Sequence, residues 1–137
     1  MAKYKIGFTT GTFDLFHTGH VRLLKSAKMM CDYLIVAVTD DLLAIKQKRK
    51  PIIDIQNRME VVGACKYVDL VIPHRGETKL EAYFKYKFDV CFIGDDWFNS
   101  EEYHQVEKDL SPYGVDMIYF PYSSNISTSD IIKSIQN

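Results

Sequence analysis

The chain of 137 residues lacks the features that mark membrane, secreted and nucleic-acid-binding proteins. No run approaches the roughly 20 apolar residues that span a bilayer, and the N-terminus shows no apolar stretch followed by a small-residue cleavage site. The net charge of −1 gives no sign of a basic surface for nucleic acid. We therefore expect a cytoplasmic protein that binds neither nucleic acid nor a membrane.

Cysteine pairs, internal repeats and flexible linkers are also missing. The three cysteines, Cys31, Cys65 and Cys91, are an odd number and form no CxxC pair, which argues against a disulfide framework and favours reduced, mostly buried thiols. No segment rich in Pro, Gly or Ser divides the chain. Apolar residues make up 47% of it, enough for one core, so we predict a single domain over residues 1–137.

Predicted strands and helices alternate along the chain. The apolar patterns predict strands at Tyr4–Thr9, Leu34–Asp40, Asp69–Pro73, Asp89–Ile93 and Val115–Phe120. They predict helices at Thr18–Met30, Ile55–Ala64, Glu77–Lys87, Glu101–Leu110 and Ser127–Ile135. Repeated βαβ units with right-handed crossovers give an α/β fold with an open, doubly wound parallel sheet of five strands.

Ligands of such sheets bind beyond the carboxyl ends of the strands, so the segment after the first strand is informative. It reads TGTFDLFHTGH (residues 10–20), and Thr18 is a candidate N-cap for the following helix. A helix N-terminus favours phosphate, and His17 and His20 are spaced to face one ligand, each able to donate a hydrogen bond and to gain charge near neutral pH. Surface histidines beside a helix cap are the alternative, while two histidines are too few for a zinc site.

A polar, basic segment, Asp40–Pro51, follows the second strand. It contains Lys46, Lys48, Arg49 and Lys50, and Arg58 opens the next helix. These cations lie at the same edge of the predicted sheet as the two histidines, where they can hold an acidic substrate. A solvated basic loop is the alternative.

Two further motifs follow the fourth and fifth strands. The first is GDDW (94–97), whose carboxylates suit a hydroxyl, an amino group or magnesium; a capping Asp beside a half-buried Trp is the alternative. The second is SSNISTS (123–129), whose hydroxyls and backbone N–H groups form a second anion site; a simple Ser/Thr cap is the alternative.

Taken together, these motifs resemble the small cytidylyltransferases, and within them the glycerol-3-phosphate cytidylyltransferases. The resemblance rests on GTFDLFHTGH, the basic loop, IIDIQNRMEVVGACKYVD, FIGDDW and NISTSDI, in that order, and it spans about Tyr4 to Ile135. It implies a Rossmann-like nucleotidylyltransferase fold and the joining of CMP from CTP to a phospho-alcohol such as glycerol 3-phosphate. It also implies magnesium with the CTP and a homodimer.

The resemblance and the motifs together give a set of candidate site residues. The predicted catalytic residues are His17, His20 and Lys46. The predicted nucleotide-binding residues are Thr10, Gly11, Thr12, Phe13, Gly94, Asp95, Ser127 and Thr128. The predicted acceptor-binding residues are Asp14, Lys48, Arg58, Lys66 and Trp97. No residue is predicted to hold a resident metal.

The sequence departs from the family pattern at three positions and leaves several functions open. Tyr122 and Asn125 replace the arginine and glycine of the RTxGIST motif, and Lys66 replaces an arginine before Tyr67. The alternatives are phosphocholine, phosphoethanolamine or another polyol phosphate as the acceptor, with Trp97 and tyrosines able to form a choline cage. Two further alternatives are an adenylyltransferase and a non-catalytic nucleotide-binding regulator. The GDDW and IST segments argue against the adenylyltransferase.

Overall fold

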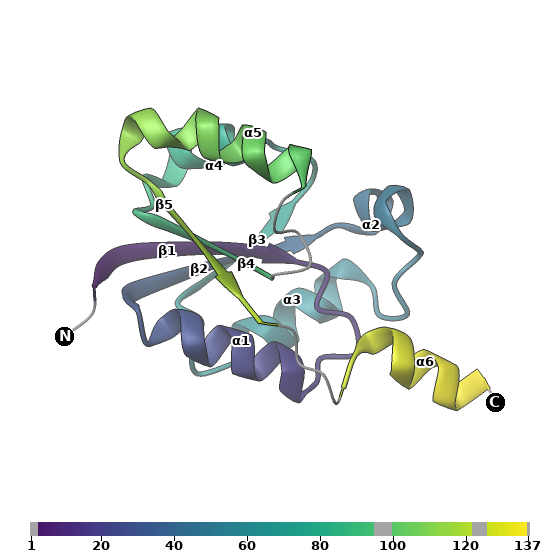
Figure 1. Cartoon of the computed structure of the whole chain (residues 1–137). Helices are drawn as coiled ribbons and strands as arrows, with labels where there is room; N and C mark the ends of the chain where they lie inside the picture. The colour runs from purple at the N-terminus through teal and green to yellow at the C-terminus, as the bar shows by residue number, and fades with distance from the viewer. Residues whose placement is uncertain (1–2, 95–99, 122–125, 137) are drawn as a thin grey trace.

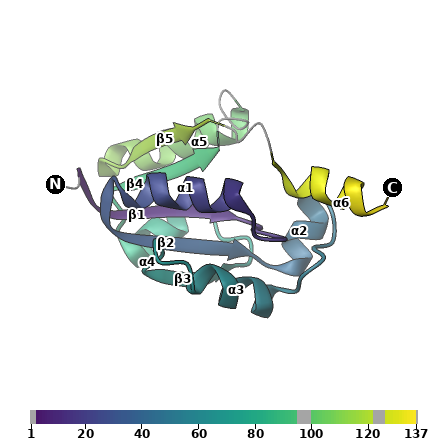
Figure 2. The same ribbon diagram turned by 90° about the horizontal axis from the view of Figure 1, so that it is seen from below.

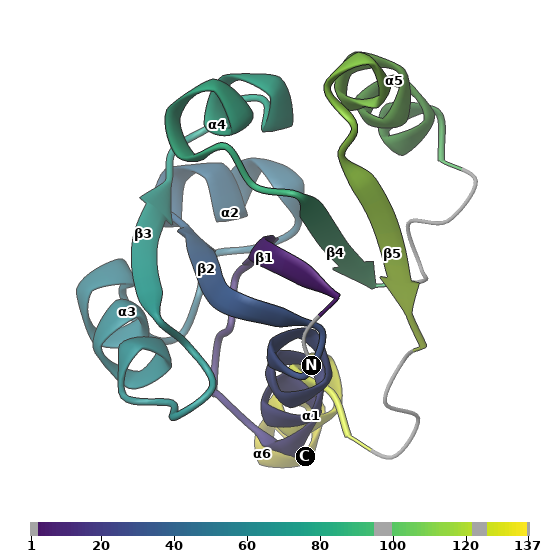
Figure 3. The ribbon, with the colours of Figure 1, turned by 90° about the vertical axis from the view of Figure 1, so that its left-hand side faces the viewer.

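A computed structural model of the chain shows a twisted sheet with helices on both faces (Figure 1). It describes residues 3–94, 100–121 and 126–136. The five strands are β1 (Tyr4–Gly11), β2 (Cys31–Thr39), β3 (Leu70–His74), β4 (Val90–Gly94) and β5 (Asp116–Phe120). All neighbouring pairs are parallel and the order is β3-β2-β1-β4-β5 (Figure 3), which confirms the predicted fold class.

The described helices are α1 (Thr18–Lys28), α2 (Asp41–Gln47), α3 (Ile55–Gly63), α4 (Lys79–Tyr86), α5 (Glu101–Leu110) and α6 (Thr128–Gln136), and a 3-10 turn covers Ser111–Tyr113. Helices α4 and α5 cover one face of the sheet, and α1 and α3 cover the other (Figures 1 and 3). Helix α2 lies in the polar segment for which the sequence predicted no helix. It begins at an N-cap, Asp40, whose carboxylate accepts a hydrogen bond from Leu43 N at 2.8 Å.

The continuous apolar run of β2 divides between the two faces of the sheet. Leu34, Val36 and Val38 belong to the core with α1 and α3, whereas Ile35 and Ala37 belong to the core with α4 and α5. Successive side chains of a strand point to opposite faces, so a strand covered on both sides must be apolar at every position. This burial fixes the sheet that carries the loops at its carboxyl edge.

The strand order reverses beside β1, which has β2 on one side and β4 on the other. The β1–α1 loop leaves the sheet there, and α2 and α6 lie beyond the same carboxyl edge (Figures 1 and 2). Such a switch point is the usual ligand position in open α/β sheets. All three cysteines are free, and Cys31 and Cys91 are buried. Among the described helices, none has the length and apolarity needed to cross a bilayer.

Candidate active site

A large cavity of about 1240 Å³ opens at the carboxyl edge of the sheet. Its walls come from the ends of the strands and from parts of α1, α2, α4, α5 and α6. The volume exceeds the upper end, roughly 1000 Å³, of a typical one-ligand pocket, so two small substrates can share it. The lining includes these predicted site residues: Thr10, Gly11, Thr12, Phe13, Asp14, His17, His20, Lys48, Gly94, Ser127 and Thr128.

The β1–α1 loop is held in a specific conformation. The N-cap of α1 is His17 rather than the predicted Thr18, which is the first helical residue. The acceptor of this N-cap is a ring nitrogen in place of the usual side-chain hydroxyl: His17 Nδ1 accepts a hydrogen bond from Gly19 N at 3.0 Å. In return, His20 Nδ1 accepts a hydrogen bond from His17 N at 3.2 Å. The two histidines thus form a reciprocal capping box.

This capping arrangement fixes which ring nitrogens face ligands. Both Nδ1 atoms accept from backbone N–H groups, so in the neutral rings the proton must lie on Nε2. The rings of His17 and His20 are stacked with centroids 3.9 Å apart. Each ring therefore carries its N–H donor on Nε2, and both residues line the cavity.

The charge state of the histidines differs from the sequence expectation. Burial, followed by the charge of His17, lowers the pKa of His20 from 6.5 to about 4. Burial alone lowers the pKa of His17. Each ring thus resists charging in the free protein, since the dry surroundings disfavour the imidazolium form. A polyanion in the cavity would oppose this effect and raise both pKa values.

Asp14 connects the loop to two other segments. Its buried carboxylate accepts hydrogen bonds from Ile52 N at 2.8 Å and Ile53 N at 3.0 Å, and its carbonyl accepts from Thr128 Oγ1 at 2.8 Å. The side chain lines the cavity, but its oxygens already hold the chain before α3. The contacts that the structure shows are those of a positioning residue.

The structure does not bring Arg58 to the cavity, where the sequence analysis expected an acceptor contact. Its side chain is only 1% exposed, and it donates to three carbonyl oxygens at 2.7 Å each, those of Thr12, Thr39 and Ile53. It also forms an ion pair with Asp41 at the start of α2. Arg58 connects the ends of β1 and β2 to the start of α2. Its guanidinium therefore holds these three segments together without lining the cavity.

The basic segment contributes one expected cation and one that was not among the predicted site residues. Lys48 and Arg49 line the cavity, whereas Lys46 is exposed and is absent from the lining. Helix α2 explains this, because Ala44 is buried and Lys46 follows it by two positions, about 200° around the helix. Arg49 was in the predicted basic run but not among the predicted site residues.

Three further predicted residues lie elsewhere or outside the described part of the chain. Lys66 is exposed between α3 and β3, at the amino edge of the sheet, with Nζ 5.3 Å from the Tyr67 ring centroid. It is therefore separated from the cavity by the length of the sheet. Asp95 and Trp97 lie outside the described residues, as do the motif departures at Tyr122 and Asn125.

The cavity also extends between α4 and α5, where the sequence analysis named no residue. Its lining there includes His74, Lys79, Tyr103 and Gln105. The rule that places ligands after each strand pointed to the end of β3, but no motif distinguished His74 from a surface residue. These side chains give the cavity a second, mixed polar and aromatic region next to the phosphate-facing one.

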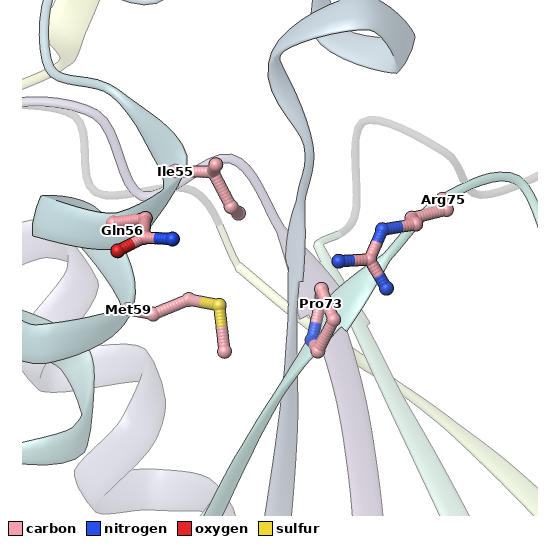
Figure 4. A pocket seen from close by; sticks show the side chains of 5 residues that line it. All are labelled: Ile55, Gln56, Met59, Pro73 and Arg75. Atoms are coloured by element: carbon pink, nitrogen blue, oxygen red, sulfur yellow. The ribbon is translucent and has the colours of Figure 1, made fainter.

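A second, smaller hollow of about 350 Å³ lies between α3 and the edge strand β3. Figure 4 shows Ile55, Gln56 and Met59 of α3 facing Pro73 and Arg75 at the end of the strand. None of the predicted site residues lines it, so we place the function in the larger cavity.

The described residues offer no preformed cage for a metal: no group of three or more His, Cys, Asp or Glu side chains is gathered among residues 3–94, 100–121 and 126–136. Magnesium commonly binds substrate phosphates and water with few protein ligands.

Comparisons with known proteins agree with this site. The family model described as cytidylyltransferase-like matches residues 8–134. The glycerol-3-phosphate cytidylyltransferase of Staphylococcus aureus is 39% identical over 129 residues, covering 93% of this chain and 92% of that protein. The FAD synthase of Pyrococcus abyssi is 39% identical over 132 residues, covering 91% and 88%.

A solved structure is similar as well. The lipopolysaccharide core biosynthesis protein of Thermoplasma volcanium superposes with a TM-score of 0.74 at 26% identity, covering 88% of this chain and 97% of that one. The region that the family model matches, residues 8–134, contains both histidines, the basic segment and α6 up to residue 134. The chain therefore belongs to the cytidylyltransferase-like family of nucleotidyltransferases.

Proposed function

We propose that this enzyme joins CMP from CTP to a phospho-alcohol, with glycerol 3-phosphate as the preferred acceptor, and releases pyrophosphate. The observation that carries the proposal is the pair of stacked histidines, each with an Nε2–H donor, in a cavity shared with Ser127 and Thr128 of the α6 segment. This arrangement suits a polyphosphate because it offers several donors and no carboxylate cluster among the described residues.

The reaction is an in-line substitution at the α-phosphorus of CTP. A phosphate oxygen of the acceptor forms the new P–O bond, and the bond to the bridging oxygen of pyrophosphate breaks, so its electron pair leaves with pyrophosphate. No covalent enzyme intermediate is needed, because the ionised acceptor is itself the nucleophile. The protein has to align two polyanions and stabilise the charge that moves to the leaving group.

We assign the histidines to that stabilisation. Nε2–H of His17 and of His20 donates to phosphoryl oxygens of CTP, while both Nδ1 atoms remain bonded to backbone N–H groups. Neutral donors in a partly dry site lose little hydration when the substrate binds. Magnesium enters as part of the substrate, bound to CTP, and neutralises part of the triphosphate charge.

The remaining roles follow the position of each residue. We propose that Thr10, Gly11, Thr12 and Phe13 surround the nucleotide together with Gly94 and Asp95. The acceptor then occupies the region toward α4 and α5, and Trp97 stays a predicted contact of it. Lys46 and Lys66 do not line the cavity, so we give them no contact with substrate. Arg58 and Asp14 act as positioning residues.

The relatives support this reaction, and one of them points to transfer from ATP as the main alternative. The Staphylococcus aureus relative is a glycerol-3-phosphate cytidylyltransferase, but the equally similar Pyrococcus abyssi relative is an FAD synthase. Identity alone therefore does not separate cytidylyl from adenylyl transfer. The GDDW and IST segments favour CTP, and transfer from ATP is the second candidate function. The homodimer and the cytoplasmic location implied by the resemblance stay predictions.

Pyrophosphate release tests the proposed function. The purified protein is incubated with magnesium and either CTP or ATP, and with glycerol 3-phosphate, phosphocholine or phosphoethanolamine. We expect release with CTP and glycerol 3-phosphate, together with a CDP-alcohol product. Release only with ATP would replace CTP by ATP in the reaction, and nucleotide binding without release with any acceptor would favour a non-catalytic regulator.

A further inference from the structure

One buried ring nitrogen at the end of β3 has no hydrogen-bond partner among the described residues. It is Nδ1 of His74, a half-buried residue that lines the large cavity. Buried polar groups are nearly always paired, because an unpaired one costs free energy. An unpaired nitrogen in a residue that lines a cavity is therefore a candidate contact for a ligand.

The direction of the His74 ring follows from the strand that carries it. Successive side chains of a strand point to opposite faces of the sheet. Ile72 packs into the core with α4 and α5, whereas Pro73 and Arg75 face α3 across the smaller hollow (Figure 4). His74 therefore lies on the same face as Ile72, where the large cavity extends between α4 and α5.

The turn after β3 fixes the ring and its tautomer. His74 Nε2 lies 3.0 Å from the carbonyl oxygen of Glu77, and Arg75 N donates to the Glu77 carboxylate at 2.9 Å. Thr78 then begins α4 with a capping box. A carbonyl oxygen only accepts hydrogen bonds, so in the neutral ring the proton lies on Nε2. Nδ1 is consequently a bare acceptor that requires an O–H or N–H donor.

The position of His74 separates it from the reacting phosphates. Strand β3 is at the edge of the sheet, and β2 lies between it and β1. Neighbouring strands are roughly 4.8 Å apart, so the ends of β1 and β3 are roughly 10 Å apart. In the proposed reaction the phosphate of the acceptor attacks beside His17 and His20, on the β1–α1 loop. The alcohol part of the acceptor is then the part that extends toward β3, and its hydroxyl groups are hydrogen-bond donors.

We propose that His74 Nδ1 accepts a hydrogen bond from a free hydroxyl of the acceptor alcohol, and that this contact selects polyol phosphates. The inference rests on the proposed function and names a residue that decides its substrate class. Glycerol 3-phosphate has two hydroxyls that can donate. The trimethylammonium end of phosphocholine has no O–H or N–H, so its binding leaves the buried nitrogen unpaired. A site built around a hydrogen bond rejects such a substrate strongly.

The first test compares glycerol 3-phosphate with propyl phosphate, which has the same three carbons and no free hydroxyl. The measurement is kcat/KM for pyrophosphate release with CTP and magnesium. We expect the wild type to favour glycerol 3-phosphate by about tenfold or more, and His74→Gln to lose most of that preference. The glutamine amide places an N–H group near the position of Nε2, so it keeps the bond to the Glu77 carbonyl but offers no acceptor at the position of Nδ1.

His74→Asn is the matched control. Its Oδ1 takes the position of Nδ1, while the bond to the Glu77 carbonyl is lost. This variant should keep the preference for glycerol 3-phosphate. If His74 only held the turn, His74→Asn would be the more damaging variant, and it would lower the turnover of both acceptors alike.

A second measurement does not depend on turnover. The chain has four histidines, so the ring-nitrogen NMR signals of histidine-labelled protein can be assigned with single variants. We expect the Nδ1 signal of His74 to be that of an unprotonated nitrogen, and to move toward that of a hydrogen-bonded one when glycerol 3-phosphate binds. Propyl phosphate should not move it.

Several results would overturn the proposal. They are equal kcat/KM for the two acceptors in the wild type, an unchanged preference in His74→Gln, or an equal movement of the Nδ1 signal with propyl phosphate, which would assign the ring to the phosphate. A signal that glycerol 3-phosphate does not move would assign Nδ1 to an ordered water.

Failure of the proposed function gives a different pattern. Turnover with ATP but not CTP would refute the proposed nucleotide, and the ratio of the two acceptors would still decide the role of His74. Absence of turnover with either nucleotide would refute the proposed reaction, and the NMR titration with the two acceptors would then decide whether His74 contacts a hydroxyl.

Discussion

The two walls that face the phosphate region of the cavity are built differently. The β1–α1 loop is held by the buried Asp14 carboxylate and Arg58 guanidinium and by the reciprocal cap of the half-buried His17 and His20. Helix α6 has no buried side chain and is attached at its first turn. One wall is preformed, whereas the other is attached by a few side-chain hydrogen bonds at the start of α6.

The two walls differ in how strongly the surrounding residues determine their conformation. Phe13 and Leu15 have φ values of 55° and 53°, a left-handed conformation that costs a non-glycine residue roughly 1–3 kcal/mol. A loop keeps such a conformation only when its surroundings determine it, as the packing of buried Phe13 over Gly11 does here. We infer that the loop provides fixed geometry for the proposed reaction.

Removal of Arg58 should disturb the preformed wall most. Arg58→Met leaves the carbonyls of Thr12, Thr39 and Ile53 without their donor and Asp41 without its partner. We expect the free energy of unfolding to fall by about 3–5 kcal/mol, measured by urea denaturation. Arg75→Met, at an exposed arginine, is the control and should change it by less than about 0.5 kcal/mol. Equal losses for the two variants would show that Arg58 is not the support of this wall.

The second effect on the preformed wall depends on pH. The unfolded chain protonates His20 near 6.5, but the folded chain does so only at about 4, so the unfolded state binds more protons between these values. Stability is therefore expected to fall as the pH drops from 6.5 toward 4, by about 2–3 kcal/mol from this group. His20→Asn should remove that part of the pH dependence in denaturation curves.

The matched control for this pH effect is His104→Asn, which changes an exposed histidine on α5. It should leave the pH dependence as in the wild type. A His20→Asn variant with the same slope between pH 6.5 and 4 as the wild type would contradict the assignment of a depressed pKa to His20.

The smallest effect is expected on α6. Ile135→Ser alters a side chain that is 75% exposed, so the free energy of unfolding should change by less than about 0.5 kcal/mol. A cost above about 2 kcal/mol in thermal denaturation would mean that the apolar side of α6 is packed in solution. In that case the contrast between the two walls would disappear.

The sequence was sufficient to predict the sheet and most of the residues of the β1–α1 loop that line the cavity. Buried parallel strands such as Leu34–Val38 are continuous apolar runs, and the motif residues follow them directly, so both could be predicted. Helix α2 was missed because its seven residues bury only Ala44, which leaves almost no apolar periodicity. Lys46 was named from the family resemblance, whereas the direction of its side chain depends on α2, and it does not line the cavity.

Other properties of the site depend on contacts between distant residues. No local pattern shows that Arg58 is buried among carbonyls of three different segments, and an arginine after a basic loop is usually expected to face solvent. The neutral state of His20 likewise follows from its burial and from the ring of His17. Motifs indicated the family, but only the packing separates side chains that line the cavity from those, such as Arg58, that lie behind it.

The most direct test of the account is the rate of pyrophosphate release from CTP and glycerol 3-phosphate by the wild type and by His17→Asn. Asparagine is a good N-cap and can accept from Gly19 N, so it preserves the start of α1 while removing the Nε2–H donor. We predict that kcat falls about a hundredfold or more while stability is retained. Release by His17→Asn at the wild-type rate would contradict the central role of the paired imidazoles.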